Sequence, residues 1–119
     1  GVYEKKKMET VSQFIRAKYF TKDGHSDEVF FHVKDRLKKM IVFKRLNLST
    51  VPFPMQGPMD AVFCRNVMIY FDNDVRKRLL AEIVRLLKPG GYLFVGHAES
   101  LTGMLTGLKA VVPSVYIKP

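Results

Sequence analysis

The stretch DAVFCRNVMIYFDNDVRKRLLAEIVRLLKPGGYLFVG, residues 60–96, predicts the fold of this chain. A mostly apolar strand is expected over residues 60–66, and an amphipathic helix over residues 72–87. The letters KPGG then end the helix and turn the chain, and a short apolar strand follows at residues 92–96. Two strands joined through a long helix form a βαβ unit, in which the strands run parallel. The sequence therefore predicts an α/β sheet covered by helices.

The helix of residues 72–87 has the clearest pattern in the chain. Asp72 or Asn73 can cap it, because their side-chain oxygens accept hydrogen bonds from the free N–H groups of the first turn. Its apolar residues recur at the spacing of one helix face, and four cations lie outside that face. The expected apolar stripe is Val75, Leu79, Leu80, Ile83, Val84 and Leu87, and the four cations are Arg76, Lys77, Arg78 and Arg85.

The remaining elements follow from shorter patterns. Three prolines and one glycine exclude a strand ladder from the loop of residues 49–58. Apolar periodicity and turn residues predict the other elements: a helix over 10–20, a polar turn over 21–27, strands over 29–33 and 40–48, and a closing pair of strands at 109–112 and 114–118.

Composition limits the classes of function. The chain has 119 residues, a net charge of +9 and one cysteine, so a disulfide framework is excluded and a cytoplasmic setting is favoured. No apolar run approaches the roughly 18 residues that span a bilayer, and no signal peptide is recognisable. Residues 1–45 hold twelve Lys/Arg against six Asp/Glu, which suits an acidic partner or a solvated surface. The first residue is Gly, so we expect a piece of a longer chain.

Polar residues follow three of the expected strands. Arg65 and Asn66 end one strand, Asn47 ends another, and Gly96 with His97 ends a third. In an open α/β sheet, ligands bind beyond the carboxyl ends of the strands. We therefore expect these residues to lie at one rim of the sheet, although polar residues also simply mark where strands stop.

The residue types suggest what this rim can bind. The guanidinium of Arg65 matches a carboxylate, and Tyr70 can stack its ring or point its hydroxyl at a reacting group. Cys64 is expected to be a small buried hydrophobe, because a thiolate is disfavoured inside an apolar strand. His97 and Glu99 are not spaced like zinc ligands, so no metal site is expected.

Residues 59–101 closely resemble the CheR family of bacterial chemotaxis receptor methyltransferases. The motifs CRNVMIYF, LLKPGG and GHAES occur in that order, and GVY, AKYF and VKDRLKKMIVFKRLNL precede them as in the family. The resemblance implies a partial Rossmann-like S-adenosylmethionine methyltransferase sheet with a small antiparallel β-subdomain. By the same resemblance, residues 1–119 are the C-terminal part of the methyltransferase domain, with the β-subdomain at about 19–43 and the α/β portion at 44–119.

The resemblance also implies an activity. The family uses S-adenosylmethionine to methylate glutamate side chains of methyl-accepting chemotaxis receptors, leaving S-adenosylhomocysteine. By resemblance, Asn47, Leu48, Arg65 and Asn66 would bind the cofactor, and Arg65 and Tyr70 would be catalytic. Neither nucleic acid nor membrane insertion is expected.

Parts of the family pattern lie outside residues 1–119. These are the helical N-terminal domain, the first strand with its glycine-rich cofactor loop, and the acidic ends of the next strands. We therefore expect the chain alone to bind the cofactor weakly or not at all, to be inactive, and to self-associate through exposed apolar surface. The alternatives are a non-catalytic basic module that binds an acidic protein or nucleic acid, and a methyltransferase with another substrate.

Overall fold

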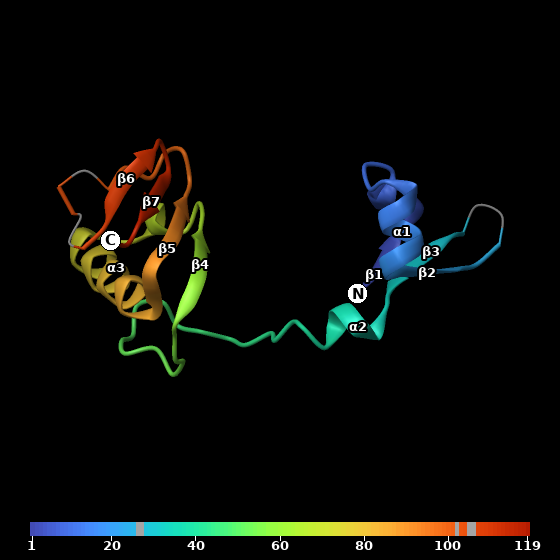
Figure 1. The fold of residues 1–119 in the computed structure, drawn as a ribbon, viewed down its shortest axis with the longest axis horizontal. Helices are drawn as coiled ribbons and strands as arrows, with labels where there is room; N and C mark the ends of the chain where they lie inside the picture. Colours follow the sequence, from blue (N-terminus) through green and yellow to red (C-terminus); the bar gives the residue numbers. More distant parts are fainter. Residues whose placement is uncertain (26–27, 102, 105–106) are drawn as a thin grey trace. The chain divides into compact units, whose positions relative to one another are not determined.

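The structure, a computed structural model, divides into two compact units. Unit 1 is Gly1–Arg45 and unit 2 is Leu46–Pro119 (Figure 1). No helix in the described part of the chain is long and apolar enough to cross a membrane. The residues that the structure describes are 1–25, 28–101, 103–104 and 107–119.

Unit 1 is built on a three-stranded antiparallel sheet with the order β1–β3–β2. Its small core joins Met8, Val29 and Phe31, against which Val11 and Phe20 pack. The sheet consists of β1 (Val2–Glu4), β2 (Phe20–Asp23) and β3 (Phe30–Val33), and the helical segments are η1 (Lys5–Met8), α1 (Gln13–Tyr19) and α2 (Asp35–Lys38).

Two expectations for unit 1 were wrong. Residues 21–23 were expected in a turn, but they belong to β2 and pair with β3. Part of the expected turn, residues 26–27, lies outside the described residues. The first helix begins at Gln13 because the Ser12 side chain caps it by accepting a hydrogen bond from Ile15 N. The helix predicted from apolar periodicity is thus present over a shorter range, but it has no buried residue, and Phe14 is 70% exposed, so the periodic residues do not form a buried face.

Unit 2 contains the predicted α/β sheet, with the strand order β4–β5–β7–β6 (Figure 1). β4 and β5 are parallel and joined through α3, whereas the last two strands form the predicted antiparallel closing pair. The elements of unit 2 are β4 (Met59–Cys64), η2 (Met68–Tyr70), α3 (Asn73–Leu86), β5 (Leu87–Val95), β6 (Lys109–Val112) and β7 (Val115–Ile117).

Helix α3 has the predicted cap and the predicted buried face. Asp72 Oδ1 accepts a hydrogen bond from Val75 N at 2.9 Å. At the other end, the Lys118 ammonium donates hydrogen bonds to Val84 O and Leu87 O, each at 2.7 Å, which satisfies carbonyls of the last turn. Of the predicted stripe, α3 buries Leu79, Leu80 and Ile83 in the core of the unit. It also buries Leu86, which the prediction did not include, whereas Leu87 already belongs to β5.

The KPGG segment differs from its prediction. It lies within β5, as an irregularity in the pairing with β4: Met59 pairs with Leu87, whereas Ala61 already pairs with Tyr92. Gly90, at φ +77°, supplies the left-handed conformation that this irregularity needs. Helix α3 therefore ends at Leu86 and continues directly into a strand.

The strand expected at residues 40–48 is absent, which corrects the prediction. Residues 41–47 have no regular secondary structure, and Met40, Val42 and Phe43 are 75%, 76% and 91% exposed. Their β-branched and aromatic composition favours a strand locally, but a strand is stable only when a neighbour pairs with it. Asn47 consequently does not end a strand.

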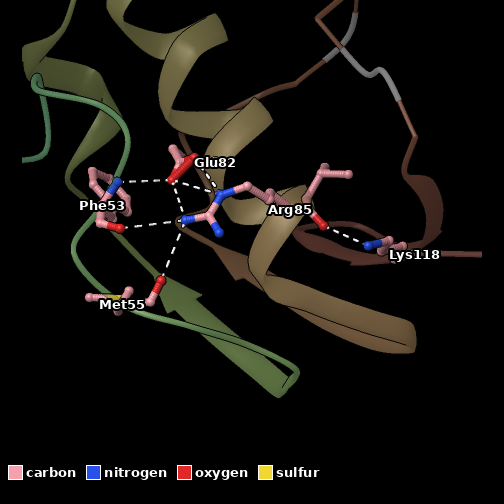
Figure 2. A network of polar contacts seen from close by, with 6 residues as sticks. Phe53, Met55, Glu82, Arg85 and Lys118 are labelled. Carbon is pink, nitrogen blue, oxygen red and sulfur yellow. Dashed lines mark hydrogen bonds and ion pairs between the residues drawn. The ribbon is translucent and has the colours of Figure 1, made fainter.

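The Pro-rich loop is attached to α3 by a buried carboxylate. Glu82, which is 7% exposed, accepts hydrogen bonds from Phe53 N at 3.0 Å and from Arg85 Nε at 2.7 Å. Arg85 Nη2 also donates to the carbonyls of Phe53 and Met55, so that its guanidinium lies between the helix and the loop (Figure 2). These bonds give an otherwise irregular segment a fixed path across the helix.

Candidate functional site

The candidate site lies at the carboxyl ends of β4 and β5. The parallel register pairs Cys64 with Val95, so the residues that follow each strand leave the sheet side by side. Arg65 and Asn66 after β4 therefore lie near Gly96 and His97 after β5. For these two strand ends the structure brings together the polar groups that the sequence predicted at one rim, while Asn47 lies outside any strand.

A buried carboxylate joins the two strand ends. Glu99 is 2% exposed, and its Oε2 accepts hydrogen bonds from Asn66 N at 2.8 Å and Gly96 N at 2.6 Å. Its Oε1 accepts from Val67 N at 2.8 Å and Met68 N at 2.7 Å. Both oxygens are thus occupied by backbone N–H groups of the two strand ends.

These four bonds also determine the charge of Glu99. Burial alone would raise its pKa, but the hydrogen bonds from Gly96, Asn66, Val67 and Met68 lower the pKa below its ordinary value. The side chain is therefore an anion at neutral pH. Its charge is stabilised by backbone dipoles.

The backbone around Glu99 is closely packed. Asn66 adopts a left-handed conformation with φ +58°, which asparagine tolerates better than most residues. Gly96 permits a close approach, because a Cβ atom there would overlap Asn66 Oδ1 and lie 2.7 Å from Glu99 Oε2. Gly96 therefore leaves the space that this packing needs, and Asn66 suits its left-handed backbone conformation.

Arg65 lines an open cavity of about 200 Å³ at this rim. Its guanidinium is on an exposed residue, where a carboxylate from solvent can approach it. His97 and Ser114 also line this cavity, and His97 Nδ1 lies 3.5 Å from Ser114 Oγ. The other lining residues are Phe63, Phe94, Val95, Pro113 and Val115.

Leu48 lines a different cavity, of about 180 Å³, whose walls are almost entirely apolar. Phe63 lines both of these cavities. Asn47 is exposed, and its Oδ1 accepts hydrogen bonds from Ser49 N and Ser49 Oγ. Of the predicted cofactor residues, Leu48 and Arg65 thus line two different cavities of unit 2, and Asn47 and Asn66 line neither of the two.

The two other residues singled out in the CRNVMIYF motif have contrasting environments. Tyr70 ends η2 and is 80% exposed, so its ring and hydroxyl face solvent. Cys64 is 7% exposed, and burial together with the charge of Glu99 raises its pKa to about 11. Cys64 is accordingly a protonated thiol at neutral pH and a poor nucleophile.

The role of Glu99 was missed at the level of sequence. A glutamate three residues after a strand gives no periodic signal, and its partners at residues 66–68 are more than thirty positions away. The weak signal available was its place in the GHAES motif, beside the end of a buried strand.

Comparison with known proteins identifies relatives along the whole chain. The family model described as CheR methyltransferase, SAM binding domain, matches residues 1–117. The chemotaxis protein methyltransferase of Klebsiella aerogenes is 38% identical over 102 residues, 86% of this chain and 35% of that protein. The chemotaxis protein methyltransferase of Borreliella burgdorferi is 36% identical over 118 residues, 99% of this chain and 40% of that protein. That of Salmonella typhimurium is 34% identical over 116 residues, 98% of this chain and 40% of that protein. The chain thus spans two fifths or less of the length of these relatives.

Proposed function

We propose that this chain, which belongs to the CheR family of methyltransferase SAM-binding domains, forms part of the catalytic site of a protein-glutamate O-methyltransferase. The proposed substrates are glutamate side chains of chemoreceptors, methylated in the cytoplasm during chemotaxis. The observation that carries the proposal is the cavity at the carboxyl ends of β4 and β5, with an exposed arginine in its wall.

The chemistry asks little of the protein beyond positioning. A glutamate side chain, with an ordinary pKa of about 4.3, is already ionised at neutral pH and needs no general base. Arg65 can bind that carboxylate with two parallel N–H groups, which fixes its orientation. Tyr70, being exposed, can contact the same substrate through its hydroxyl or ring. Orientation and charge complementarity then lower the barrier.

The residues of unit 2 fit one side of S-adenosylmethionine. When bound, this cofactor supplies a methyl group activated by a sulfonium charge. The apolar wall at Leu48 suits the face of an adenine ring, whereas the amides of Asn47 and Asn66 suit hydroxyl or amino groups. The cavity of about 180 Å³ is smaller than the roughly 300–1,000 Å³ typical of ligand pockets. We therefore expect weak cofactor binding, or none, by the chain alone.

A chimera tests this proposal. Residues 1–117 would replace the matching segment of the Salmonella typhimurium relative, and transfer of a radiolabelled methyl group to chemoreceptor fragments would be measured. We expect label on receptor glutamates that base treatment releases as methanol, as it does from a methyl ester. A folded, cofactor-binding chimera that transfers no methyl group, or that forms a base-stable product, would contradict the proposal.

Unit 1 supports a second candidate function, the binding of an acidic partner. A cavity of about 400 Å³ is lined by three cations, Lys5, Arg16 and Lys22, above an apolar floor that includes Val29 and Phe31. The Arg16 Nε is inaccessible to solvent and has no hydrogen-bond partner in the described part of the chain. Such a site favours an anionic ligand with an apolar part.

Salt dependence distinguishes the forms of this second function. Binding of a glutamate-rich peptide and of single-stranded DNA would be measured at low and high salt, with Arg16→Gln as the variant. A basic module would lose peptide binding in the variant, and tight, steeply salt-dependent DNA binding would favour a nucleic-acid partner. Absence of binding to either ligand would rule out this candidate.

A further inference from the structure

The backbone after β4 has the geometry of an anion-binding site. Asn66 is left-handed and Val67, at φ −116° and ψ −45°, is right-handed, so their successive N–H groups point to the same side and bind the two oxygens of one carboxylate. Such a concave arrangement of amides, known as a nest, binds anions. Here Glu99 of the same chain occupies it with its carboxylate.

We propose that Glu99 is a positioning residue of the methyl-transfer site: by filling this nest and binding Gly96 N, it fixes the direction in which Arg65 and Asn66 leave β4. The inference rests on the proposed function, because it assumes that Arg65 binds the substrate carboxylate. In this proposal the backbone nest and the Arg65 guanidinium bind two different carboxylates. The backbone nest is taken by the protein's own Glu99, and Arg65 remains for the substrate.

The geometry requires a carboxylate of this length. Each oxygen accepts two N–H groups, so a glutamine at the same place would turn its NH₂ group toward two donors. An aspartate is one methylene shorter and cannot reach both strand ends from the same backbone position. We therefore expect Glu99→Gln and Glu99→Asp both to release residues 66–68 from Gly96.

A matched control is available in the same unit. Glu82 is also buried and also accepts a backbone N–H, from Phe53, but it lies on α3. Glu82→Gln should therefore lower stability while leaving the strand ends in place. Comparison of the two glutamine variants separates a local effect on the site from a general loss of stability.

The experiment uses the full chain, labelled with ¹⁵N, and follows the amide resonances of residues 66–68 and 96. Glu99→Gln should move all four resonances upfield, and Glu82→Gln should leave them unchanged. In Glu99→Ala, added acetate should occupy the vacated nest and return the resonances toward their original positions in a saturable manner. If Glu99→Gln fails to fold, Glu99→Ala with acetate and Glu99→Asp provide the same readout. Unmoved resonances, or no response of Glu99→Ala to acetate, would overturn the inference.

Binding of Nα-acetyl-L-glutamate amide, followed by the same spectra, links this geometry to Arg65. We expect Arg65→Ala to abolish binding and Glu99→Gln to weaken it at least tenfold. Binding lost in Arg65→Ala but unaltered in Glu99→Gln would overturn the positioning role. If the glutamate amide binds the unaltered chain and Arg65→Ala equally, the result counts against the proposed function of Arg65. The four amide resonances would still decide whether Glu99 holds the strand ends.

Discussion

Two buried carboxylates, Glu82 and Glu99, connect distant backbone segments of unit 2. Glu82 binds the Pro-rich loop to α3, and Glu99 binds the end of β4 to the end of β5. Each charge is compensated by hydrogen bonds, which is the condition under which a buried carboxylate is tolerated. Individual side chains therefore determine the paths of segments that lack regular structure.

The pH dependence of stability tests the role of Glu82. Its hydrogen bonds with Arg85 and Phe53 lower its pKa to about 2, below the ordinary value of about 4.3 for an unfolded chain. Its stabilising contribution is therefore complete above about pH 4.3 and is lost as the pH falls toward 2. Urea unfolding of Glu82→Gln should show lower stability than the unaltered chain at pH 7, and a difference that shrinks toward pH 2. A difference independent of pH would contradict this role.

Gly96 should tolerate an added side chain poorly. In Gly96→Ala the added Cβ would overlap Asn66 Oδ1 and crowd the Glu99 carboxylate, at a cost of about 1–3 kcal/mol in the free energy of unfolding. Gly90→Ala is the control: no atom lies within 4 Å of its Cβ, and its cost of about 1 kcal/mol comes from the positive φ alone. Denaturant unfolding that ranks Gly90→Ala as the more damaging change would contradict the packing described at Gly96.

For single residues, the sequence predicted correctly that Arg65, Asn66 and His97 lie at one rim, but it wrongly placed Asn47 at the end of a third strand there and did not predict what holds the rim together. Arg65, Asn66 and His97 were predicted together because parallel strands end at the same edge of a sheet. Glu99 was not assigned to the site, because its role depends on two backbone segments whose meeting only the fold establishes.

Among the elements, α3 depends most on local signals. Its cap and its apolar stripe act within a few positions, so the sequence predicted both ends of the helix to within one residue. The strand expected at residues 40–48 was wrong for the opposite reason, since pairing depends on a distant partner. The KPGG irregularity in β5 was likewise read as a turn, because local signals do not show strand register.

The cap of α3 gives a prediction at this scale. Asp72→Ala removes the side-chain acceptor for Val75 N and should lower the free energy of unfolding by about 1 kcal/mol. Asp72→Ser keeps an acceptor and should recover most of that loss. Thermal unfolding monitored by circular dichroism would measure both, and equal midpoints for the alanine variant and the unaltered chain would refute the capping role.

At the scale of the whole molecule, we expect exposed apolar surface to promote self-association. Phe63 is 72% exposed and stacks on Phe94, with ring centroids 4.5 Å apart, on the same strands that carry the site. β4 is also an edge strand of its sheet, in which the described strands have the order β4–β5–β7–β6. An exposed aromatic cluster beside a strand edge promotes association.

We accordingly predict that the chain self-associates at high concentration. Phe63→Lys should reduce this association, because it places a charge at the edge strand, whereas Phe14→Lys on α1 is a control at an equally exposed phenylalanine of unit 1. Light scattering over a concentration series would measure the mass of each variant. A monomeric mass for the unaltered chain at the highest concentration would contradict the prediction.

The rate of methyl transfer to receptor glutamates by the chimera with Arg65→Ala, at saturating cofactor, tests the central claim most directly. If the guanidinium at the end of β4 orients the substrate carboxylate, the rate should fall by about 10²-fold or more, with the fold retained. A rate within twofold of that of the unaltered chimera would show that this arginine does not take part in the reaction.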